Sequence, residues 1–483
     1  MNEQKKPSCY SRPLITNLFH WKNIAAIAAA ITIAASFYRY MDLLHSGAVV
    51  AYLLYPASIG CLALLLYTRV YTQLPEIRLF GAFFAWVLVV IALNMNRADG
   101  ALSTEWFHSL CATSFLCFSL PYAFESTEQP RVVSFLAWFT VFIGGALSAL
   151  SLYFVATGRI IDINASIEGV LGIGADNRLG MFCHPNTAAS ICGIGIVLSV
   201  YLCFTLRSKR LRFVLLFPFV LFVFALALTD SRTGILSTAL ALGFEVFFIL
   251  NARSFRASKK LLRSLLAIVI ATACMALFYQ GNAWIRQGYN TLASRATIEK
   301  AAVAELAEPT HAANGSAPPQ APSTEVSNRG LSNFDNFNGR TAIWSATLKG
   351  LFENPSILFT GTTPLIAGQT MTPYFPKEAP RGLFHNSFIA VLVSFGLPGL
   401  LLILAFIALL FVRSLRLITR NLYNEQQLPA RLLTSVLIFT LAESTMEQFL
   451  FVDGMPSLVW VWFLLAAGFT FCFSREAPQA PAD

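Results

Sequence analysis

Charged residues are scarce in this sequence. They make up 12% of its 483 residues, whereas 56% are hydrophobic. A typical soluble domain has about 25% charged residues, so the composition excludes a soluble enzyme and a disordered chain. The nine cysteines form no Cys-x-x-Cys pair, and most of them lie in apolar runs. That distribution is typical of small buried side chains and not of a disulfide framework or a zinc site.

Several motifs of well-known enzyme classes are missing as well. The chain has no P-loop, so an ATP-driven transporter would need a partner subunit. It has no His-Glu-x-x-His and no Gly-x-Ser-x-Gly motif, and its predicted outer face offers no acidic pair to hold a divalent metal. We therefore expect no metal and no other cofactor.

Long apolar runs dominate what is present. A helix needs about 20 apolar residues to cross a bilayer. The sequence predicts an all-α polytopic membrane protein with about 12 transmembrane helices, and a polar tail ahead of the first one argues against a cleavable signal peptide. The predicted helices span residues 23–40, 46–68, 79–95, 104–124, 131–155, 185–206, 211–229, 233–251, 260–279, 385–413, 430–448 and 456–474.

The basic residues, which give a net charge of +9, indicate how the chain is oriented. With the N-terminus in the cytoplasm, 21 of the 34 Lys and Arg fall on that side and five in the short loops opposite. Cytoplasmic loops collect such residues. This asymmetry predicts cytoplasmic tails at 1–22 and 475–483, nine helices within 23–280 and three within 385–474.

The remaining eight basic residues lie in one long outer loop, residues 281–384. Its first part, 281–300, is expected to continue the preceding helix. Residues 301–330 are rich in Ala, Pro and Ser and are predicted to be a disordered insert. Residues 338–353 carry apolar positions at helical spacing, and Asn354-Pro355 should end that helix.

Two arginines at the predicted outer mouth of the bundle are candidate ligands for an anionic substrate. Arg232 lies in a very short turn between two apolar helices, and Arg340 follows Gly339 and precedes the apolar positions of the helix predicted within 338–353. Charge near a bilayer is costly and often functional. The alternatives are an Arg232 that snorkels to lipid headgroups and an Arg340 that is merely solvated.

A histidine and a third arginine join them. His385 stands where the long loop re-enters the membrane, and a helix N-terminus there would favour the neutral imidazole that a general base requires. It could instead be only an interfacial cap. Arg178 precedes another helix start. Glu443 and Glu447 lie on one helix face and add acid, although they could serve only to pair with an arginine.

These residues suit a lipid-linked diphosphate donor. Guanidinium groups bind phosphate oxygens in bidentate fashion, stay charged, and can neutralise a diphosphate leaving group in place of a metal. A neutral histidine could then accept the proton of an acceptor hydroxyl. No nucleic-acid partner is expected.

The motifs resemble the O-antigen ligase and polymerase superfamily of bacterial inner membranes. The ligase motif is His, then Asn, Ser or Gln, nine residues, Gly, two residues, and Gly, Thr or Val. Residues 385–399 match it at every fixed position. Arg232 and Leu236 match the family's arginine–leucine pattern, and Arg340 resembles its second essential arginine. The long loop between helices nine and ten also agrees.

The resemblance implies a GT-C-like, inverting and metal-independent glycosyltransferase. It would move a glycan from undecaprenyl diphosphate to a lipid A–core acceptor at the periplasmic face of the inner membrane, in contact with membrane lipids. His385 would be catalytic, and Arg232, Arg340 and Arg178 would bind the diphosphate. A repeat-unit polymerase, a protein O-oligosaccharyltransferase and a lipid or polysaccharide transporter remain alternatives.

Overall fold

A computed structural model describes most of the chain. The described residues are 21–38, 59, 75–96, 100–125, 127–162, 170–174, 177–206, 208–254, 260–307, 339–375, 384–420, 427–450 and 457–476. Within them, seven helices are long and apolar enough to cross a membrane, and shorter apolar helices accompany them. The chain is therefore a helical multi-pass membrane protein, as its composition predicts.

Each predicted membrane helix has a counterpart except the one at 46–68, which lies outside the described residues apart from Ile59. The structure shows α2 (Trp21–Tyr38), α4 (Pro75–Asn94), α5 (Gly100–Ser119), α6 (Gln129–Thr157), α7 (Pro185–Thr205), α8 (Lys209–Thr229), α9 (Arg232–Ser254), α10 (Lys260–Ala307), α14 (Ser387–Arg420), α15 (Gln427–Ser444) and α16 (Leu458–Glu476).

The core forms around α7 and α16. Nearly every side chain from Thr187 to Leu202 in α7 is buried, and so is the apolar stretch of α16. A helix that is apolar on all sides belongs at the centre of a bundle. By contrast, α8 and α10 expose many large apolar side chains, which is expected of lipid-facing helices.

The helix α14 is bent and packs against α4. Gly396 has non-helical torsion angles (φ 66°, ψ −177°) that divide α14 into two parts. Near the other end of α14, the Nε atom of Arg413 lies 2.9 Å from Oε1 of the buried Glu76 at the start of α4. The two helices therefore run antiparallel, as expected of segments that cross in opposite directions.

The long loop is largely helical where it is described. The helix α10 continues through the predicted 281–300 segment and on to Ala307, beyond the expected start of the insert. The rest of the predicted insert lies outside the described residues. The loop then forms α11 (Arg340–Glu353), α12 (Pro355–Thr360), α13 (Pro364–Met371) and a 3-10 turn, η5 (Thr372–Tyr374). A second such turn, η2 (Leu120–Ala123), follows α5.

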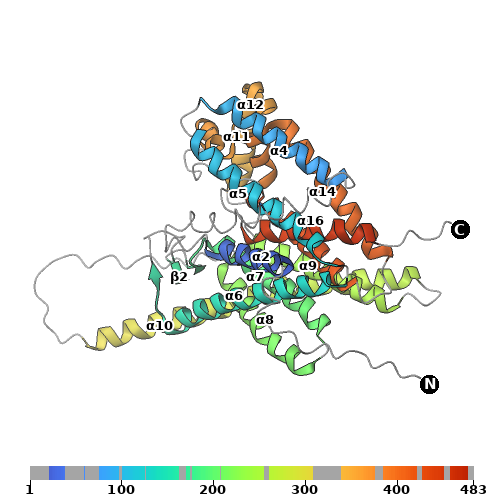
Figure 1. Ribbon diagram of the computed structural model, residues 1–483. Coiled ribbons are helices and arrows are strands. Elements are labelled where there is room, and N and C mark those ends of the chain that lie inside the picture. Colours follow the sequence, from blue (N-terminus) through green and yellow to red (C-terminus); the bar gives the residue numbers. More distant parts are fainter. Residues whose placement is uncertain are drawn as a thin grey trace, which may run out of the picture.

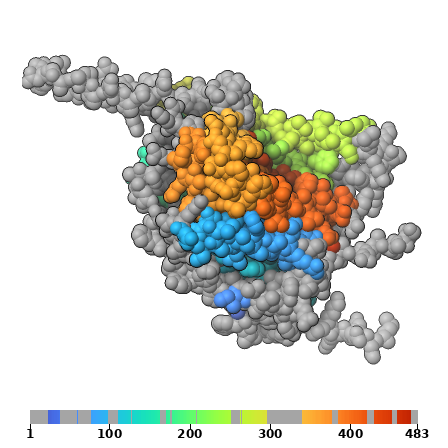
Figure 2. Space-filling model, turned by 90° about the horizontal axis from the view of Figure 1, so that it is seen from above, coloured from blue at the N-terminus to red at the C-terminus, as the bar shows by residue number. Residues whose placement is uncertain are grey.

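Segments α11–α13 lie together beside α4 at one end of the molecule (Figures 1 and 2). The helix α11 begins where the sequence predicts, and Asn354 ends it.

A small antiparallel sheet departs from the all-helical prediction. It consists of β1 (Ile161–Asp162), β2 (Val170–Ile173) and β3 (Leu179–Met181), in the order β1-β2-β3. Leu171 pairs with Ile161 on one side and with Met181 on the other. The sheet lies in the segment that connects α6 and α7. Arg178 directly precedes β3, so the pairing of β3 with β2 holds the backbone next to it in place.

Candidate active site

Glu447 is the centre of a polar network at one end of the bundle. It follows the end of α15 and is buried. Its Oε1 atom accepts hydrogen bonds from an NH2 group of Arg340 at 2.5 Å and from Nδ2 of Asn186 at 2.6 Å. Its Oε2 atom lies 3.4 Å from Nδ1 of His385. One carboxylate therefore joins residues from three distant parts of the sequence.

His385 stands just outside α14. Asn386 is the N-cap, because its Oδ1 atom accepts hydrogen bonds from the backbone N–H groups of Phe388 and Ile389 at 2.9 and 3.0 Å. His385 therefore precedes the helix, which corrects the prediction that it lies at the helix start. Its backbone is left-handed (φ 48°), an uncommon conformation for a non-glycine residue that turns the side chain toward Glu447.

Ser387 locks this geometry. Its hydroxyl donates to the backbone carbonyl of Glu447 at 2.8 Å. The same oxygen accepts hydrogen bonds from the backbone N–H groups of Phe449 and Leu450 at 3.0 and 3.2 Å. The chain from Glu447 to Leu450 is thus fastened to the first turn of α14, and His385 and Glu447 are held together by bonds other than their own.

Arg340 is the first residue of α11 and follows Gly339. Its guanidinium also donates to the backbone carbonyl of Met446 at 2.6 Å, and its side chain is only 13% exposed. These contacts contradict the alternative of a merely solvated surface arginine. The indole N–H of Trp344 donates to the carbonyl of Phe384 at 2.9 Å, so α11 is also tied to the residue before His385.

Arg178 reaches the network through Asn186. One of its NH2 groups donates to Oδ1 of Asn186 at 2.5 Å, and its Nε atom donates to the carbonyl of Thr229 at the end of α8. Arg286 of α10, which the sequence analysis did not identify, donates to the carbonyl of Leu228 at 3.2 Å and to that of Asn177. Two arginines thus cap the negative end of α8.

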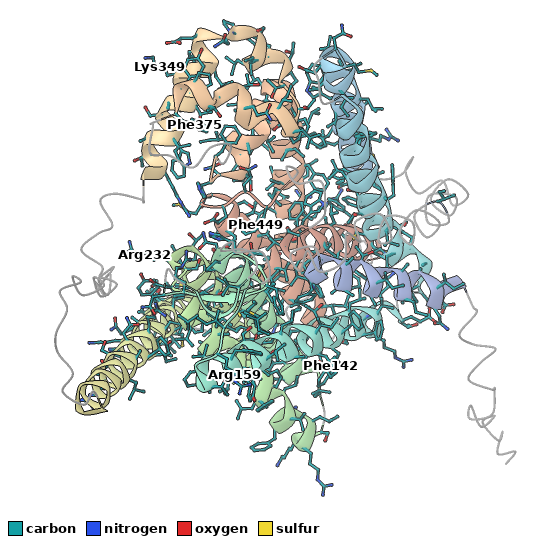
Figure 3. All side chains as sticks on the ribbon, turned by 90° about the vertical axis from the view of Figure 1, so that its left-hand side faces the viewer. Phe142, Arg159, Arg232, Lys349, Phe375 and Phe449 are labelled. Atoms are coloured by element: carbon teal, nitrogen blue, oxygen red, sulfur yellow. The ribbon has the colours of Figure 1, made fainter. Side chains whose placement is uncertain are left out.

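Arg232 opens α9 at the same end of the bundle. A Cβ atom on Gly234 would lie 2.6 Å from Cβ of Ala189, so the first turns of α9 and α7 are in close contact. In Figure 3, Arg232 lies on the side of these helices that faces α11–α13. No described hydrogen bond joins Arg232 to His385 or Glu447.

A second carboxylate lies beneath the network. Glu443 is fully buried, and its Oε1 atom accepts a hydrogen bond from the hydroxyl of Ser190 at 2.7 Å. The two acids were predicted on one face of a single helix, but α15 ends at Ser444 and Glu447 lies beyond it. Both side chains nevertheless point toward α7, and only Glu447 contacts an arginine in the described part of the chain.

The electrostatics of the site favour an ionised Glu447. Burial raises the pKa of its carboxyl, but the hydrogen bond with His385 and the charge of Arg340 outweigh burial, so that the pKa lies below its usual value. The described residues contain no group of three or more His, Cys, Asp and Glu that could hold a metal ion. The site therefore presents cationic groups and a histidine around one anionic side chain.

The bend in α14 has its own partner. The backbone N–H groups of Thr362 and Thr363 donate to the carbonyl of Ser394 at 3.1 and 3.0 Å, and the indole N–H of Trp86 donates to that of Phe395 at 2.6 Å. Gly361 and Gly396 touch at this crossing: a Cβ on Gly361 would lie 2.7 Å from N of Gly396. The glycine of the His385 motif thus allows the loop backbone to approach.

One comparison with known protein families gives a match. A family model described as O-antigen ligase matches residues 217–404. The match contains Arg232, Arg340 and His385, whereas Arg178 and Glu447 lie outside it. No curated protein shows significant similarity to the chain. The match supports the resemblance seen in the motifs and implies a membrane enzyme of the glycosyl-transfer type.

Proposed function

With residues 217–404 matching its model, the chain belongs to the O-antigen ligase superfamily, and we propose that it is the ligase itself. It transfers O-antigen polysaccharide from undecaprenyl diphosphate to lipid A–core at the periplasmic face of the bacterial inner membrane. The reaction inverts the anomeric centre and needs no metal. The fold is GT-C-like, with about 12 transmembrane helices.

In this proposal the arginines bind the diphosphate of the donor. Arg340 and Arg232 supply forked donors to the phosphate oxygens, and their charge stabilises the departing diphosphate. Arg178 lies farther out in the network, where it orients Asn186.

His385 is the general base. The hydroxyl oxygen of the acceptor sugar attacks the anomeric carbon of the donor, and the bond from that carbon to the diphosphate oxygen breaks. The hydroxyl proton passes to Nε2 of His385, and undecaprenyl diphosphate leaves with the electron pair. Nε2 holds a lone pair when Nδ1 carries the hydrogen that faces Oε2 of Glu447.

Glu447 serves both partners. It holds the productive tautomer of His385, and it keeps Arg340 in place before the donor binds. When a phosphate oxygen replaces the carboxylate as the partner of Arg340, Glu447 becomes a stronger acceptor for Nδ1–H. Donor binding would thereby prepare the base.

One observation carries the proposal. The arginine and the histidine that the family motifs single out lie in different elements, yet both contact the same carboxylate. A surface arginine and an interfacial histidine with no common function would have no reason to share a buried carboxylate. A diphosphate site next to a general base would place an arginine and a histidine close together in this way.

The His385→Ala variant tests the chemistry. We expect normal expression and donor binding but a loss of transfer of about 10²–10⁴-fold, the usual contribution of a general base. Transfer by the purified wild type should persist in excess EDTA. Near-normal transfer by His385→Ala would remove the histidine from the mechanism.

A deletion strain separates ligase from polymerase. Without a ligase, long glycan chains stay on undecaprenyl diphosphate and none reach lipid A–core. Without a polymerase, lipid A–core carries a single repeat unit and no long chain forms. Gel separation of lipopolysaccharide, probed for the glycan, distinguishes the two. We expect the first pattern, and a core-plus-one-repeat band would make the polymerase assignment right.

A further inference from the structure

A cavity lined by two arginines lies at the end of the bundle opposite the His385 site. It has a volume of about 630 Å³ and is bounded by the start of α6, the end of α7, the start of α8 and the start of α15. Asn186 and Thr205 stand at the two ends of α7, about 29 Å apart along a helix axis. The cavity is therefore separated from the His385 site by roughly the thickness of a bilayer core.

Two arginines line this cavity, and both have capacity for an anion. Arg131 forms no hydrogen bond or ion pair with its side chain in the described part of the chain. Arg212 uses only its Nε atom, which donates to the carbonyl of Leu206 at 2.8 Å. No acidic residue lines the cavity among the described residues. Two guanidinium groups without a carboxylate favour a phosphate-bearing ligand.

Further polar groups lie deeper, between aromatic walls. The hydroxyls of Ser134 and Tyr201 are 3.1 Å apart, and Tyr201 is almost fully buried. Trp138 and Phe204 also line the cavity. A ligand that matches these side chains carries an anionic group that binds the two arginines. It also has hydroxyl or ester oxygens near Ser134 and Tyr201, and apolar carbon that packs against the aromatic rings.

The surroundings indicate that the ligand comes from the membrane. Phe135 and Phe204 line the cavity and are still 46% and 41% exposed, so its mouth opens on the lipid-facing surface. The charge pattern of the sequence assigns this end to the cytoplasmic side, where the leaflet carries anionic lipids. A soluble phosphate compound would gain nothing from the exposed rings.

We propose that this cavity binds the headgroup of an anionic phospholipid. Arg131 and Arg212 hold the phosphate, the hydroxyls of Ser134 and Tyr201 face the glycerol backbone, and one acyl chain lies along Phe135 and Phe204. The site is distinct from the His385 network, and its test does not depend on the proposed transfer reaction.

Native mass spectrometry of the purified full-length protein tests the proposal. Phosphatidylglycerol and phosphatidylcholine of equal chain length are the probes. We expect the wild type to retain phosphatidylglycerol preferentially and the Arg131→Ala/Arg212→Ala variant to bind it on the order of 10-fold to 30-fold more weakly, since each basic residue near an anionic surface contributes about 1 kcal/mol.

The matched control is Lys209→Ala/Arg210→Ala. It removes the same charge from the start of α8, but neither residue lines the cavity. It should bind phosphatidylglycerol as the wild type does. An equal loss in both double variants would reduce the effect to general surface charge and overturn the proposal.

A lysine variant and a competition experiment test the proposal further. Arg131→Lys/Arg212→Lys keeps the charge but not the forked geometry, so it should bind phosphatidylglycerol more weakly than the wild type and more tightly than the alanine variant, and it gives a result even if the alanine variant fails to fold. Glycerol 1-phosphate, the headgroup analogue without acyl chains, should not displace the lipid. Displacement by it at equal concentration would assign the cavity to a soluble phosphate compound instead.

Discussion

Replacing Glu447 by Gln should abolish most of the transfer activity while leaving the fold in place. The substitution keeps the shape of the side chain, and its remaining oxygen can still accept hydrogen bonds from Arg340 and Asn186. The position of Oε2 becomes an amide that donates. Facing Nδ1 of His385, that amide favours the tautomer with the hydrogen on Nε2, which cannot accept a proton.

The size of the effect follows from these contacts. Loss of the basic tautomer should lower kcat by about 10²-fold to 10⁴-fold, the range of general-base catalysis. The cost in stability should be smaller, about 1–3 kcal/mol, because Arg340 loses its counter-charge but keeps a hydrogen-bond acceptor and the carbonyl of Met446.

The assay is transfer by the purified enzyme from a lipid-linked donor, with kcat and KM measured separately. Glu443→Gln is the matched control: it is the same substitution at another buried acid of this segment, which contacts Ser190 and not His385. Glu447→Asp restores the charge and should recover part of kcat. Activity of Glu447→Gln within threefold of wild type, or an equal loss in Glu443→Gln, would refute the reasoning.

The pH dependence of thermal stability is a second test of the ionised state of Glu447. The pKa of Glu447 is depressed in the folded protein, so its ionised form adds stability that is complete above the unfolded value of 4.5 and is lost as the pH falls through the folded pKa. The difference in Tm between wild type and Glu447→Gln should therefore shrink as the pH falls below about 4.5.

Two further variants test other parts of the site. Gly396→Ala should destabilise the protein by about 1–3 kcal/mol and impair transfer, because the torsion angles of Gly396 are accessible almost only to glycine. A Cβ atom there would also lie 2.5 Å from the carbonyl oxygen of Phe359. Gly288→Ala, which has open space around it, is the control in thermal unfolding. Arg340→Lys and Arg232→Lys should each lose most donor binding, since lysine keeps the charge but not the forked geometry, and a fully active lysine variant at either position would exclude that residue as a diphosphate clamp.

The sequence predicts most of the helices because apolar runs of membrane length leave few alternatives. It also predicts α11, whose apolar positions repeat with helical spacing. The sheet was missed because its strands have only two to four residues and show no alternating pattern. Arg286 was missed for a different reason: a single arginine in an amphipathic helix gives no signal until the end of α8 is seen beside it.

The sequence predicts most residues of the site but not the contacts between them. The sequence predicts Glu447 only as one of two acids on a helix face, and nothing in a single sequence links it to His385, 62 residues earlier. The available signal was the cost of a buried carboxylate near a membrane, which requires a cationic or hydrogen-bonding partner. That rule suggests that a partner exists without identifying it.

The bend in α14 gives a physical reason for the spacing of the His385 motif. A helix that stops at Phe395 leaves its last carbonyls without partners, and the donors that satisfy them come from Thr362, Thr363 and Trp86. Thr363 is itself held in a strained conformation (φ 103°, ψ 149°), which persists only because the crossing determines it.

The loop that begins at Arg340 is thus fastened at two places, by Trp344 to Phe384 just before His385 and by Thr362 and Thr363 to α14 at the bend. Because these attachments lie on either side of the first half of α14, we expect Arg340 and His385 to keep a fixed separation even if the outer helices shift. A base and a phosphate-binding group need that constancy, since small misplacements of reacting groups lower rates steeply. In the proposed mechanism, the glycine at the bend supports catalysis by permitting the crossing that sets this separation.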